Sequence, residues 1–346
     1  MRPADCLCGL ELEGGWHVNS IIKPAPASTG GHFSVGYHVT GRNGRPAYLK
    51  ALDFSEAFQD PDFPRRLEEM TRAYNYERDL LAKCRDRRLD RIVTPLADGS
   101  IEVPGGFGPL GKVSYLIFEL ASGDIRKEVA SWPQFDVAWS LRSLHQTSIG
   151  LRQLHSVGVA HQDLKPSNVL VFPELGSKVA DLGRASYINT PSRVDACQIP
   201  GDVGYAPPEQ WYGWRSSGFD ARYLADLYLL GSLVFFYFAK CSATQAIHAK
   251  LSIAQGMNLT RVNFLQDLPY IQHAFSEARA DLTIEIRTLA GDLADEIIMI
   301  VTQLCEPDPR RRGDPRVLES KIPPYDLQPY ISRFDRLSTI AEMRML

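Results

Sequence analysis

One short stretch of the chain gathers residue types that could transfer a phosphoryl group. It reads His161-Gln162-Asp163-Leu164-Lys165-Pro166-Ser167-Asn168, so an aspartate and an asparagine lie close together on either side of a lysine. Such a loop can supply a base, a cation and a metal ligand at one place, which phosphoryl transfer requires. Asp181-Leu182-Gly183 follows, and a carboxylate beside a glycine at a strand end suits a hard divalent cation. These residues predict a site for metal-assisted phosphoryl transfer.

Two charged residues upstream fit the same chemistry. Lys50 ends an expected strand, Tyr48-Leu49-Lys50, and Glu77 lies on a charged segment at 64–90. The apolar residues of that segment recur with helical spacing, which predicts one amphipathic helix. They are Leu67, Met70, Tyr74, Leu80, Leu81 and Cys84.

The elements that must position these residues fall into two parts. Residues 14–111 contain short alternating segments separated by Gly and Pro, a pattern typical of strands. After an apolar strand at 113–120, helical periods dominate, around 134–157, 221–239 and 289–305. The sequence therefore predicts a small, mostly β part and a larger, mostly α part, with the join near Ala121.

Composition excludes several classes of protein. The chain has 346 residues, of which 44% are hydrophobic, so disorder and collagen-like repeats are ruled out. With 38 Lys and Arg against 41 Asp and Glu, the net charge of -3 gives no global reason to expect nucleic acid or an anionic membrane as a partner. The most apolar stretch, 227–239, is shorter than the roughly 20 residues that span a membrane, and it predicts a buried helix.

The cysteines and the start of the chain indicate the compartment. The six cysteines are scattered, and none of them has the spacing of a zinc site. Residues 1–12 lack the apolar run of a signal peptide. Both observations favour a reducing, cytoplasmic setting.

In their order, these motifs resemble the eukaryotic-like (Hanks-type) serine/threonine protein kinases. The ordered matches are a Gly-rich turn at 29–37, the strand Lys50, the helix Glu77, HxDLKPxN at 161–168, D-x-G at 181–183 and Pro-Pro-Glu at 207–209. Residues 226–231 and 308–312 resemble two later motifs of the family. The resemblance covers roughly residues 20–320, with HQD in place of HRD and DLG in place of DFG.

The resemblance implies an α+β, bilobal protein kinase fold. A small β-rich N-lobe with one key helix would bind ATP, and a larger α-helical C-lobe would carry the catalytic loop, the activation segment and the substrate-binding surface. The predicted boundaries are an N-terminal extension at 1–20, the N-lobe at 21–120 and the C-lobe at 121–346.

The resemblance also implies which residues are catalytic. Asp163 would accept the proton of the substrate hydroxyl, and Lys165 would steady the transferring phosphoryl group. Asn168 and Asp181 would bind Mg²⁺, with Mn²⁺ as an alternative metal. The cofactors implied are therefore ATP and Mg²⁺.

Further residues of the resemblance would bind ATP or hold the C-lobe together. Lys50 would bind the α- and β-phosphates, and Glu77 would fix that lysine by an ion pair. Glu209 and Arg312 would form a buried ion pair. The other predicted ATP-binding residues are Gly30, Gly31, Phe33, Ser34, Tyr48, Phe118, Glu119, Ala121 and Leu170.

The nucleotide-binding motifs depart from the family at four positions. Thr29 and Ser34 stand where the outer glycines of the turn are usual, and Gly36 replaces a valine that packs on adenine. Tyr48 replaces a small alanine and shares a strand face with Lys50. We expect Tyr48 either to stack on the base from a shifted position or to obstruct it.

Two departures concern the catalytic centre. Gln162 replaces the arginine that binds a phosphorylated activation loop, so we predict activity that does not depend on a phosphate bound at this position. Asp202 stands where a threonine is common, and a second acid is expected to raise the pKa of neighbouring carboxyls or to recruit a basic substrate.

Three functions follow from these features. The first is an ATP-dependent protein kinase that phosphorylates Ser and Thr hydroxyls of protein substrates and also itself, since Lys165 in DLKPSN resembles the serine/threonine branch. The second is a nucleotide-binding pseudokinase scaffold, which the altered Gly-rich turn and Tyr48 would favour. The third is a small-molecule phosphotransferase, against which the C-lobe motifs at 207–209 and 308–312 argue.

Overall fold

The structure is a computed structural model of the whole chain, and it divides into two compact units. Unit 1 comprises Met1–Leu89 and Val93–Ser122, and unit 2 comprises Asp90–Ile92 and Gly123–Leu346. The residues that the structure describes are 2–22, 34–55, 57, 60–105, 107, 111–214, 218–255 and 263–344. The main division between the two units follows Ser122.

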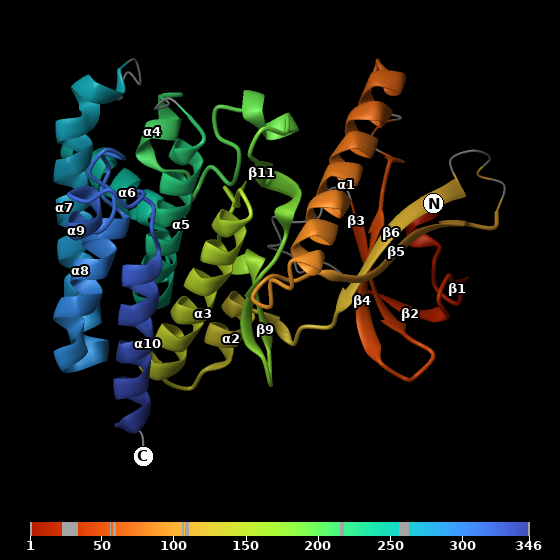
Figure 1. Cartoon of the computed structure of the whole chain (residues 1–346), viewed down its shortest axis with the longest axis horizontal. Helices are drawn as coiled ribbons and strands as arrows, with labels where there is room; N and C mark the ends of the chain where they lie inside the picture. The colour runs from red at the N-terminus through yellow and green to blue at the C-terminus, as the bar shows by residue number, and fades with distance from the viewer. Residues whose placement is uncertain are drawn as a thin grey trace. The chain divides into compact units, whose positions relative to one another are not determined.

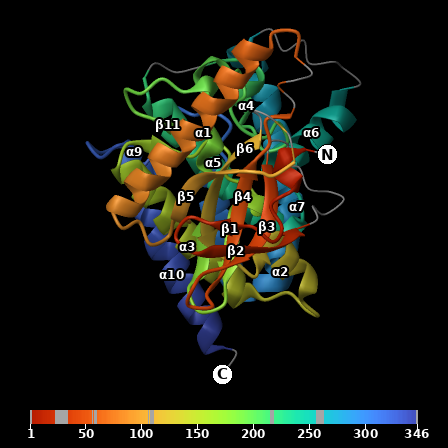
Figure 2. The same cartoon turned by 90° about the vertical axis from the view of Figure 1, so that its right-hand side faces the viewer.

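Unit 1 is built on a six-stranded antiparallel sheet with the order β1-β2-β3-β4-β6-β5 (Figures 1 and 2). Alternation of buried and exposed residues along these segments produces strands with one face in a core. The strands are β1 Glu11–Leu12, β2 Trp16–Ile22, β3 Ser34–Thr40, β4 Pro46–Leu52, β5 Pro95–Glu102 and β6 Lys112–Glu119.

Register divides β3 and β4 into two faces. Tyr37 lies opposite Leu49, and both side chains are fully buried in the core of unit 1. Gly36 lies opposite Lys50 on the other face of the sheet, and His38 lies opposite Tyr48. The pleat therefore places Lys50 and Tyr48 on the face that points away from this core.

Residues 1–20, predicted as an extension, lie within unit 1. They contribute the short helix Pro3–Asp5, the strand β1 and the first part of β2 to the unit. Ala4, Leu7 and Leu12 are buried in the same core as the sheet, and the Tyr37 hydroxyl donates to the carbonyl oxygen of Ala4 at 2.6 Å. Their apolar side chains tie this segment to the sheet.

The charged segment forms the helix α1, Phe63–Asp86, as the apolar spacing predicts. Asp62 caps its N-terminus by accepting a hydrogen bond from the Arg65 amide, and a proline lies in its first turn. The helix ends four residues before the predicted boundary at Asp90, because Leu89 N–H already donates to the Cys84 carbonyl. Glu77 is buried on the inner face of α1.

Unit 2 is mostly helical, as predicted from the long apolar periods (Figure 1). Its helices are α2 Ile125–Ser131, α3 Val137–Ser156, α4 Pro208–Trp211, α5 Asp220–Ala239, α6 Ala243–Gln255, α7 Phe264–Ala290, α8 Ala294–Leu304, α9 Pro315–Leu318 and α10 Gln328–Met343. The helix α10 packs along α3, and Tyr330, Phe334 and Leu337 are among its buried residues. The α+β protein kinase fold predicted from the sequence is confirmed by these two units.

Helix α5 is long and apolar enough to cross a membrane by length and composition alone. However, 83% of its most apolar window is buried inside unit 2. The prediction of a buried helix at 227–239 is therefore confirmed. The residues that follow α5 form α6 and α7.

Short strands hold the loops that carry the chemistry of unit 2. The strands β7 Gly123–Asp124, β9 Val169–Phe172 and β10 Gly176–Val179 form a three-stranded sheet. A second pair joins β8 Val159–Ala160 to β11 Ser186–Tyr187. The segments around Asp163 and Asp181 are thus anchored on both sides by strand pairing.

Candidate active site

Lys50 and Glu77 form an ion pair inside unit 1. The Lys50 Nζ atom lies 2.8 Å from Glu77 Oε1 and 3.1 Å from Oε2, and both side chains are largely buried. Strand β4 carries the lysine, and helix α1 carries the glutamate. The pair holds a cationic group at a defined place on the face of the sheet, where it can bind phosphate oxygens.

The other predicted residues of unit 1 lie on the same face or at the end of β6. Tyr48 lies on β4 beside Phe118 of β6, with ring centroids 6.4 Å apart. Glu119 is the last residue of β6, and Ala121 follows in the connection to unit 2. Ser34 begins β3, whereas Gly30, Gly31 and Phe33 lie outside the described residues.

The Asp163 carboxylate is held from three sides within unit 2. Its Oδ1 accepts a hydrogen bond from the Asp202 amide at 2.8 Å, and its Oδ2 accepts one from Asn168 Nδ2 at 3.3 Å. The Lys165 ammonium lies 3.4 Å from Oδ2 and 3.1 Å from the Asp202 carboxylate. This arrangement fixes the direction of the carboxylate and places a cation beside it.

Burial raises the pKa of Asp163 above the usual value of an aspartate, and the Asp181 charge acts in the same direction. The Lys165 charge and the hydrogen bond from the Asp202 amide lower it in part. The expectation that Asp202 raises the pKa of Asp163 is therefore wrong, because Asp202 contributes a backbone donor and its own carboxylate binds Lys165. A raised pKa makes Asp163 a better proton acceptor near neutral pH.

Asn168 and Asp181 supply oxygen atoms that fit a hard divalent cation. Asn168 ends a short helix at Pro166–Asn168, and its amide nitrogen donates to the Asp163 carbonyl at 2.8 Å. That bond orients the amide, and its oxygen, which accepts a hydrogen bond from the Ser167 hydroxyl at 3.2 Å, has a second lone pair for a metal. Asp181 is exposed and has a left-handed backbone with φ of 62°.

Asn168 and Asp181 together offer two side chains with oxygen ligands. Among the described residues, no group of three or more His, Cys, Asp or Glu side chains could hold a metal ion. Magnesium commonly binds one or two protein carboxylates together with substrate phosphates. The pair of Asn168 and Asp181 matches this mode of binding.

Asp226 anchors the loop that carries Asp163. It is fully buried near the start of α5, and it accepts hydrogen bonds from the His161 amide at 2.8 Å and the Gln162 amide at 2.7 Å. Its Oδ2 also lies 2.9 Å from His155 Nε2. His161 is buried as well and contacts the Ala180 carbonyl at 3.0 Å, which indicates a structural role.

Gln162 connects this loop to the segment that follows Asp181. Its amide nitrogen donates to Ser186 Oγ at 2.7 Å, and Ser186 Oγ donates to Asp195 Oδ1 at 3.1 Å. Arg222 of α5 lies 2.8 Å from the same carboxylate oxygen. Ser192 and Asp195 also form a capping box on the short helix Arg193–Ala196.

Glu209 and Arg312 form the buried ion pair that the resemblance implies. The two guanidinium nitrogens each lie 2.8 Å from a Glu209 oxygen, and the Arg312 side chain is fully buried. Arg312 also donates to the carbonyl oxygens of Leu224 and Glu306. This prediction is confirmed.

Sequence reasoning missed three contributors to the site. His155 lies on α3 and acts through Asp226, and no motif marked it. Gly201 allows Asp202 to approach Asp163, because a Cβ at Gly201 would collide with the Gln162 carbonyl oxygen. Asp195 could have been found, since Ser192-x-x-Asp195 has the spacing of a capping box.

Leu170, predicted to line the nucleotide site, lies on β9 of unit 2. It pairs with Asp124 and with Lys178 on the two neighbouring strands. Its side chain is half-buried.

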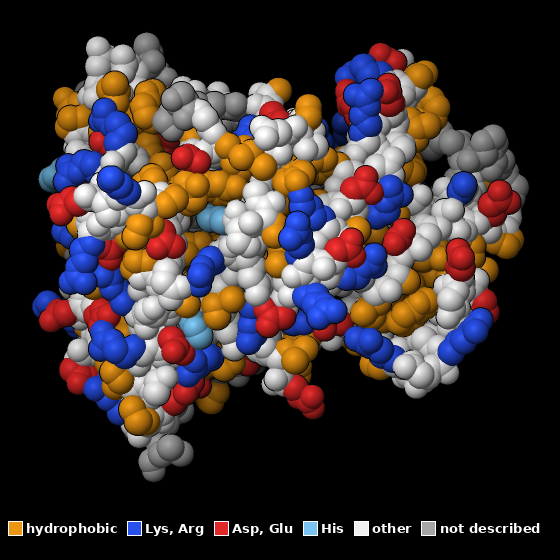
Figure 3. Space-filling model, in the orientation of Figure 1, with side chains coloured by type: hydrophobic (Ala, Val, Ile, Leu, Met, Phe, Trp, Pro, Cys, Tyr) orange, Lys and Arg blue, Asp and Glu red, His pale blue; other side chains and the backbone are white. Residues whose placement is uncertain are grey.

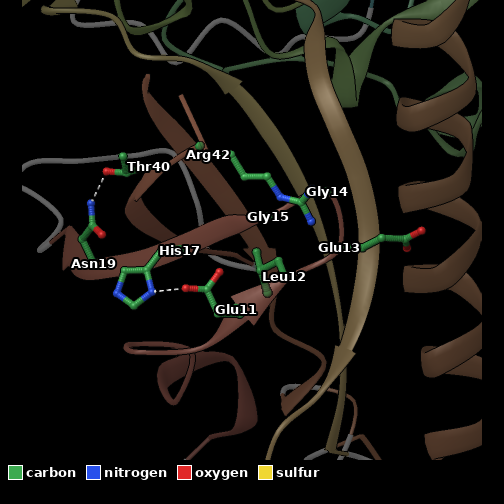
Figure 4. A pocket seen from close by; sticks show the side chains of 10 residues that line it. Glu11, Leu12, Glu13, Gly14, Gly15, His17, Asn19, Thr40 and Arg42 are labelled. Atoms are coloured by element: carbon green, nitrogen blue, oxygen red, sulfur yellow. Dashed lines mark hydrogen bonds and ion pairs between the residues drawn. The ribbon is translucent and has the colours of Figure 1, made fainter. Parts of the chain in front are cut away.

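Unit 1 also has an open pocket that contains none of the predicted site residues (Figure 4). Its volume is about 670 Å³, and the turns after β1 and β3 form its walls. Glu11 pairs with His17 at 2.8 Å, and Asn19 donates to Thr40 at 2.7 Å. These four polar side chains of the lining thus form two pairs.

Comparison with known proteins identifies the family. Residues 65–319 match the protein kinase domain. The chain belongs to the protein kinase family. Membership implies the use of ATP and, as is typical of the family, of a divalent metal. Figure 3 shows Lys and Arg side chains interspersed with Asp and Glu over the face in view.

Three relatives show the extent of the similarity. Serine/threonine-protein kinase PknA of Mycobacterium tuberculosis is 27% identical over 225 residues, which are 64% of this chain and 46% of that protein. Serine/threonine-protein kinase par-4 of Caenorhabditis elegans is 33% identical over 124 residues, or 35% of this chain and 20% of the relative. A probable serine/threonine-protein kinase PknB of Lactococcus lactis is 26% identical over 162 residues, covering 46% and 25%. The chain thus spans less than half the length of these relatives.

Proposed function

We propose that this chain is a serine/threonine protein kinase that transfers the γ-phosphoryl group of ATP to protein hydroxyls, its own included. The observation that carries the proposal is the geometry around Asp163. A buried carboxylate with a raised pKa is held by the Asp202 amide and Asn168, and the Lys165 cation lies beside it.

Each residue has a distinct part in this reaction. Asp163 orients the acceptor hydroxyl and takes its proton at a carboxylate oxygen, while the Lys165 ammonium stabilises negative charge that develops beside it. Lys50, fixed by Glu77, holds phosphate oxygens in place. A divalent metal on Asn168 and Asp181 would supply additional positive charge against the phosphates.

The test uses γ-labelled ATP with Mg²⁺ or Mn²⁺, a panel of generic proteins and the full chain. We expect labelled phosphoserine and phosphothreonine in the panel and in the chain, and loss of label in Lys50→Ala. Glu285→Gln, an exposed acid on α7, is the matched control and should transfer normally. Nucleotide binding without transfer would contradict the proposal and favour a scaffold. Label on small molecules alone would favour a small-molecule phosphotransferase.

We also propose that activity does not require a phosphate on the segment 181–209. Gln162 reaches this segment through the hydroxyl of Ser186, and the Asp195 carboxylate supplies the negative charge that contacts Arg222. Ser186 is fully buried, so the serine that Gln162 contacts is closed to modification in this conformation. The segment is held by groups already present in the chain.

A comparison of phosphatase-treated and untreated protein tests this second proposal. We expect the two samples to have the same kcat, and Asp195→Asn to lower kcat because the contact with Arg222 loses its charge. Asp281→Asn, an exposed acid of unit 2, serves as the control for Asp195→Asn. Inactivity after phosphatase treatment, with recovery on rephosphorylation of the segment, would overturn the proposal.

Substrate and compartment complete the proposal. A protein with a Ser or Thr acceptor is the expected partner, and neither nucleic acid nor a membrane is expected. The six free cysteines support a cytoplasmic, reducing setting.

A further inference from the structure

Two departures from the family, Gly36 and Tyr48, lie together on the sheet of unit 1. Gly36 is opposite Lys50 in the register of β3 and β4, and Tyr48 is two residues before Lys50 on β4. All three residues therefore lie on one face of the sheet. The sequence left two alternatives for Tyr48, stacking on a base or obstructing it, and the contact with Gly36 distinguishes them.

The Tyr48 ring lies over Gly36. A Cβ atom built on Gly36 would be 2.9 Å from Tyr48 Cε2, 3.0 Å from its hydroxyl oxygen and 3.3 Å from Cζ. Contacts shorter than about 3.4 Å are tighter than ordinary van der Waals packing. A larger residue at 36 would displace the ring, so Gly36 provides the space that the tyrosine occupies.

The direction of the ring follows from the register. His38, not Gly36, is directly opposite Tyr48, so Gly36 is the diagonal neighbour. Diagonal positions on adjacent strands are about 7–8 Å apart, a distance that an aromatic side chain covers only by leaning along the sheet. The end of the Tyr48 ring reaches Gly36, so the side chain leans across the sheet toward the level of Lys50, and it remains partly exposed.

Phe118 extends the same surface on the other side of Tyr48. It is opposite Tyr48 in the pairing of β4 with β6, and the two ring planes meet at 35°. Gly36, Tyr48 and Phe118 thus form a row over three adjacent strands. Tyr48 and Phe118 lie two residues, or about 6.6 Å, along the strands from the level of Lys50, and Gly36 lies at the level of Lys50 itself.

We propose that Tyr48, lying over Gly36, is the platform on which this chain stacks the purine ring of its nucleotide. The inference rests on the proposed function, which places phosphates at Lys50. A base joined to those phosphates can reach a surface one strand repeat away. An aromatic side chain can stack on any purine, because stacking uses the flat face of the base and needs no hydrogen bond to the edge of the base.

The magnitude follows from base–aromatic stacking. Alanine substitution of a stacking aromatic residue weakens binding by roughly 5- to 150-fold. We expect Tyr48→Ala to weaken the binding of ADP and of GDP by the same factor, within this range. Tyr48→Phe should bind both nucleotides with the affinity of the parent. Tripolyphosphate has no base, so its affinity should be unchanged in Tyr48→Ala and reduced in Lys50→Ala.

Isothermal titration calorimetry on the full chain measures these affinities, and thermal unfolding of each variant shows that it is folded. Tyr270→Ala, an exposed tyrosine on α7, is the matched control. Unchanged or tighter binding of ADP by Tyr48→Ala would overturn the inference, because the tyrosine would then be an obstruction or have no contact with the base. Equal weakening of tripolyphosphate and ADP would also overturn it.

The Gly36 contact provides a second test. Gly36→Val should weaken ADP binding, because the valine displaces the Tyr48 ring. The double variant Gly36→Val with Tyr48→Ala should bind ADP more tightly than the product of the two single effects on affinity predicts. Additive effects would contradict the inference. The two levels remain separable: a parent chain that binds ADP but transfers no phosphate refutes the proposed function alone, whereas transfer with unchanged ADP binding in Tyr48→Ala refutes this inference alone.

Discussion

Replacing Asp226 by asparagine tests how the catalytic loop is held. The substitution keeps the shape of the side chain, but one carboxylate oxygen becomes an NH₂ group that faces a backbone N–H. The parent accepts bonds from the His161 amide at 2.8 Å and the Gln162 amide at 2.7 Å, so either orientation of the asparagine loses one of them. His155 Nε2, at 2.9 Å, is affected as well.

The expected cost follows from these bonds. Loss of a hydrogen bond to a charged acceptor costs about 1.5–3 kcal/mol, and the buried N–H left unpaired adds about 1–3 kcal/mol. We therefore expect Asp226→Asn to lower the free energy of unfolding of unit 2 by roughly 3–5 kcal/mol. For a domain of this size, that corresponds to a fall in Tm of roughly 6–20 °C.

Thermal unfolding and kcat, measured on the same samples, provide the assay. We expect kcat to fall too, because the two residues whose amides donate to Asp226, His161 and Gln162, immediately precede Asp163 in the chain. Asp220→Asn, an exposed acid at the start of the same helix, is the control and should have little effect. Stability within about 1 kcal/mol of the parent, together with an unchanged kcat, would refute the anchoring role of Asp226.

Three further predictions concern unit 2. Arg312→Met should lower the free energy of unfolding by about 3–5 kcal/mol, because it leaves the Glu209 carboxylate buried without its partner, and adding Glu209→Leu should restore much of this loss. Chemical denaturation of both variants measures the two effects, and a small effect of Arg312→Met alone would contradict the prediction. Tyr330→Phe should leave stability unchanged or raise it by about 1 kcal/mol, because among the described residues the buried Tyr330 hydroxyl has no hydrogen-bond partner; a clear loss in the same assay would show otherwise. The Tm of Asp163→Asn should rise relative to that of the parent between about pH 4 and pH 7, because the pKa of Asp163 is higher in the fold than in the unfolded chain, so the parent's favourable contribution is complete only at low pH and is lost as pH rises through the folded value. A difference in Tm that does not change with pH would contradict this assignment.

The order of the motifs was sufficient to predict the fold and two ion pairs. Lys50 and Glu77 are 27 positions apart in the chain, and their pairing follows from a strand lysine and a helix glutamate in the family's order. The pair Glu209–Arg312 was likewise predictable, although its residues are 103 positions apart. In both pairs, opposite charges in an apolar setting need each other.

What the sequence did not show depends on side-chain direction and on local space. The lean of Tyr48 over Gly36 results from the diagonal register of β3 and β4, which composition and spacing do not encode. Two consecutive hydrogen bonds connect Gln162 to Ser186 and Ser186 to Asp195. They join a serine of a two-stranded sheet to a capping aspartate nine residues later. The sequence also did not show that the Asp202 carboxylate turns toward Lys165. The expectation that Asp202 raises the pKa of Asp163 was therefore wrong, because the backbone N–H of Asp202, and not its carboxylate, binds Asp163.

The rate of phosphoryl transfer in Asp163→Asn tests the central claim most directly. It should be measured in a single turnover at saturating nucleotide, with ADP affinity determined on the same preparation. A positioned general base typically contributes roughly 10²- to 10⁴-fold to a rate. We predict a fall of that size in Asp163→Asn with unchanged affinity for ADP, whereas transfer at the parent's rate would contradict the assignment of Asp163 as the group that takes the hydroxyl proton.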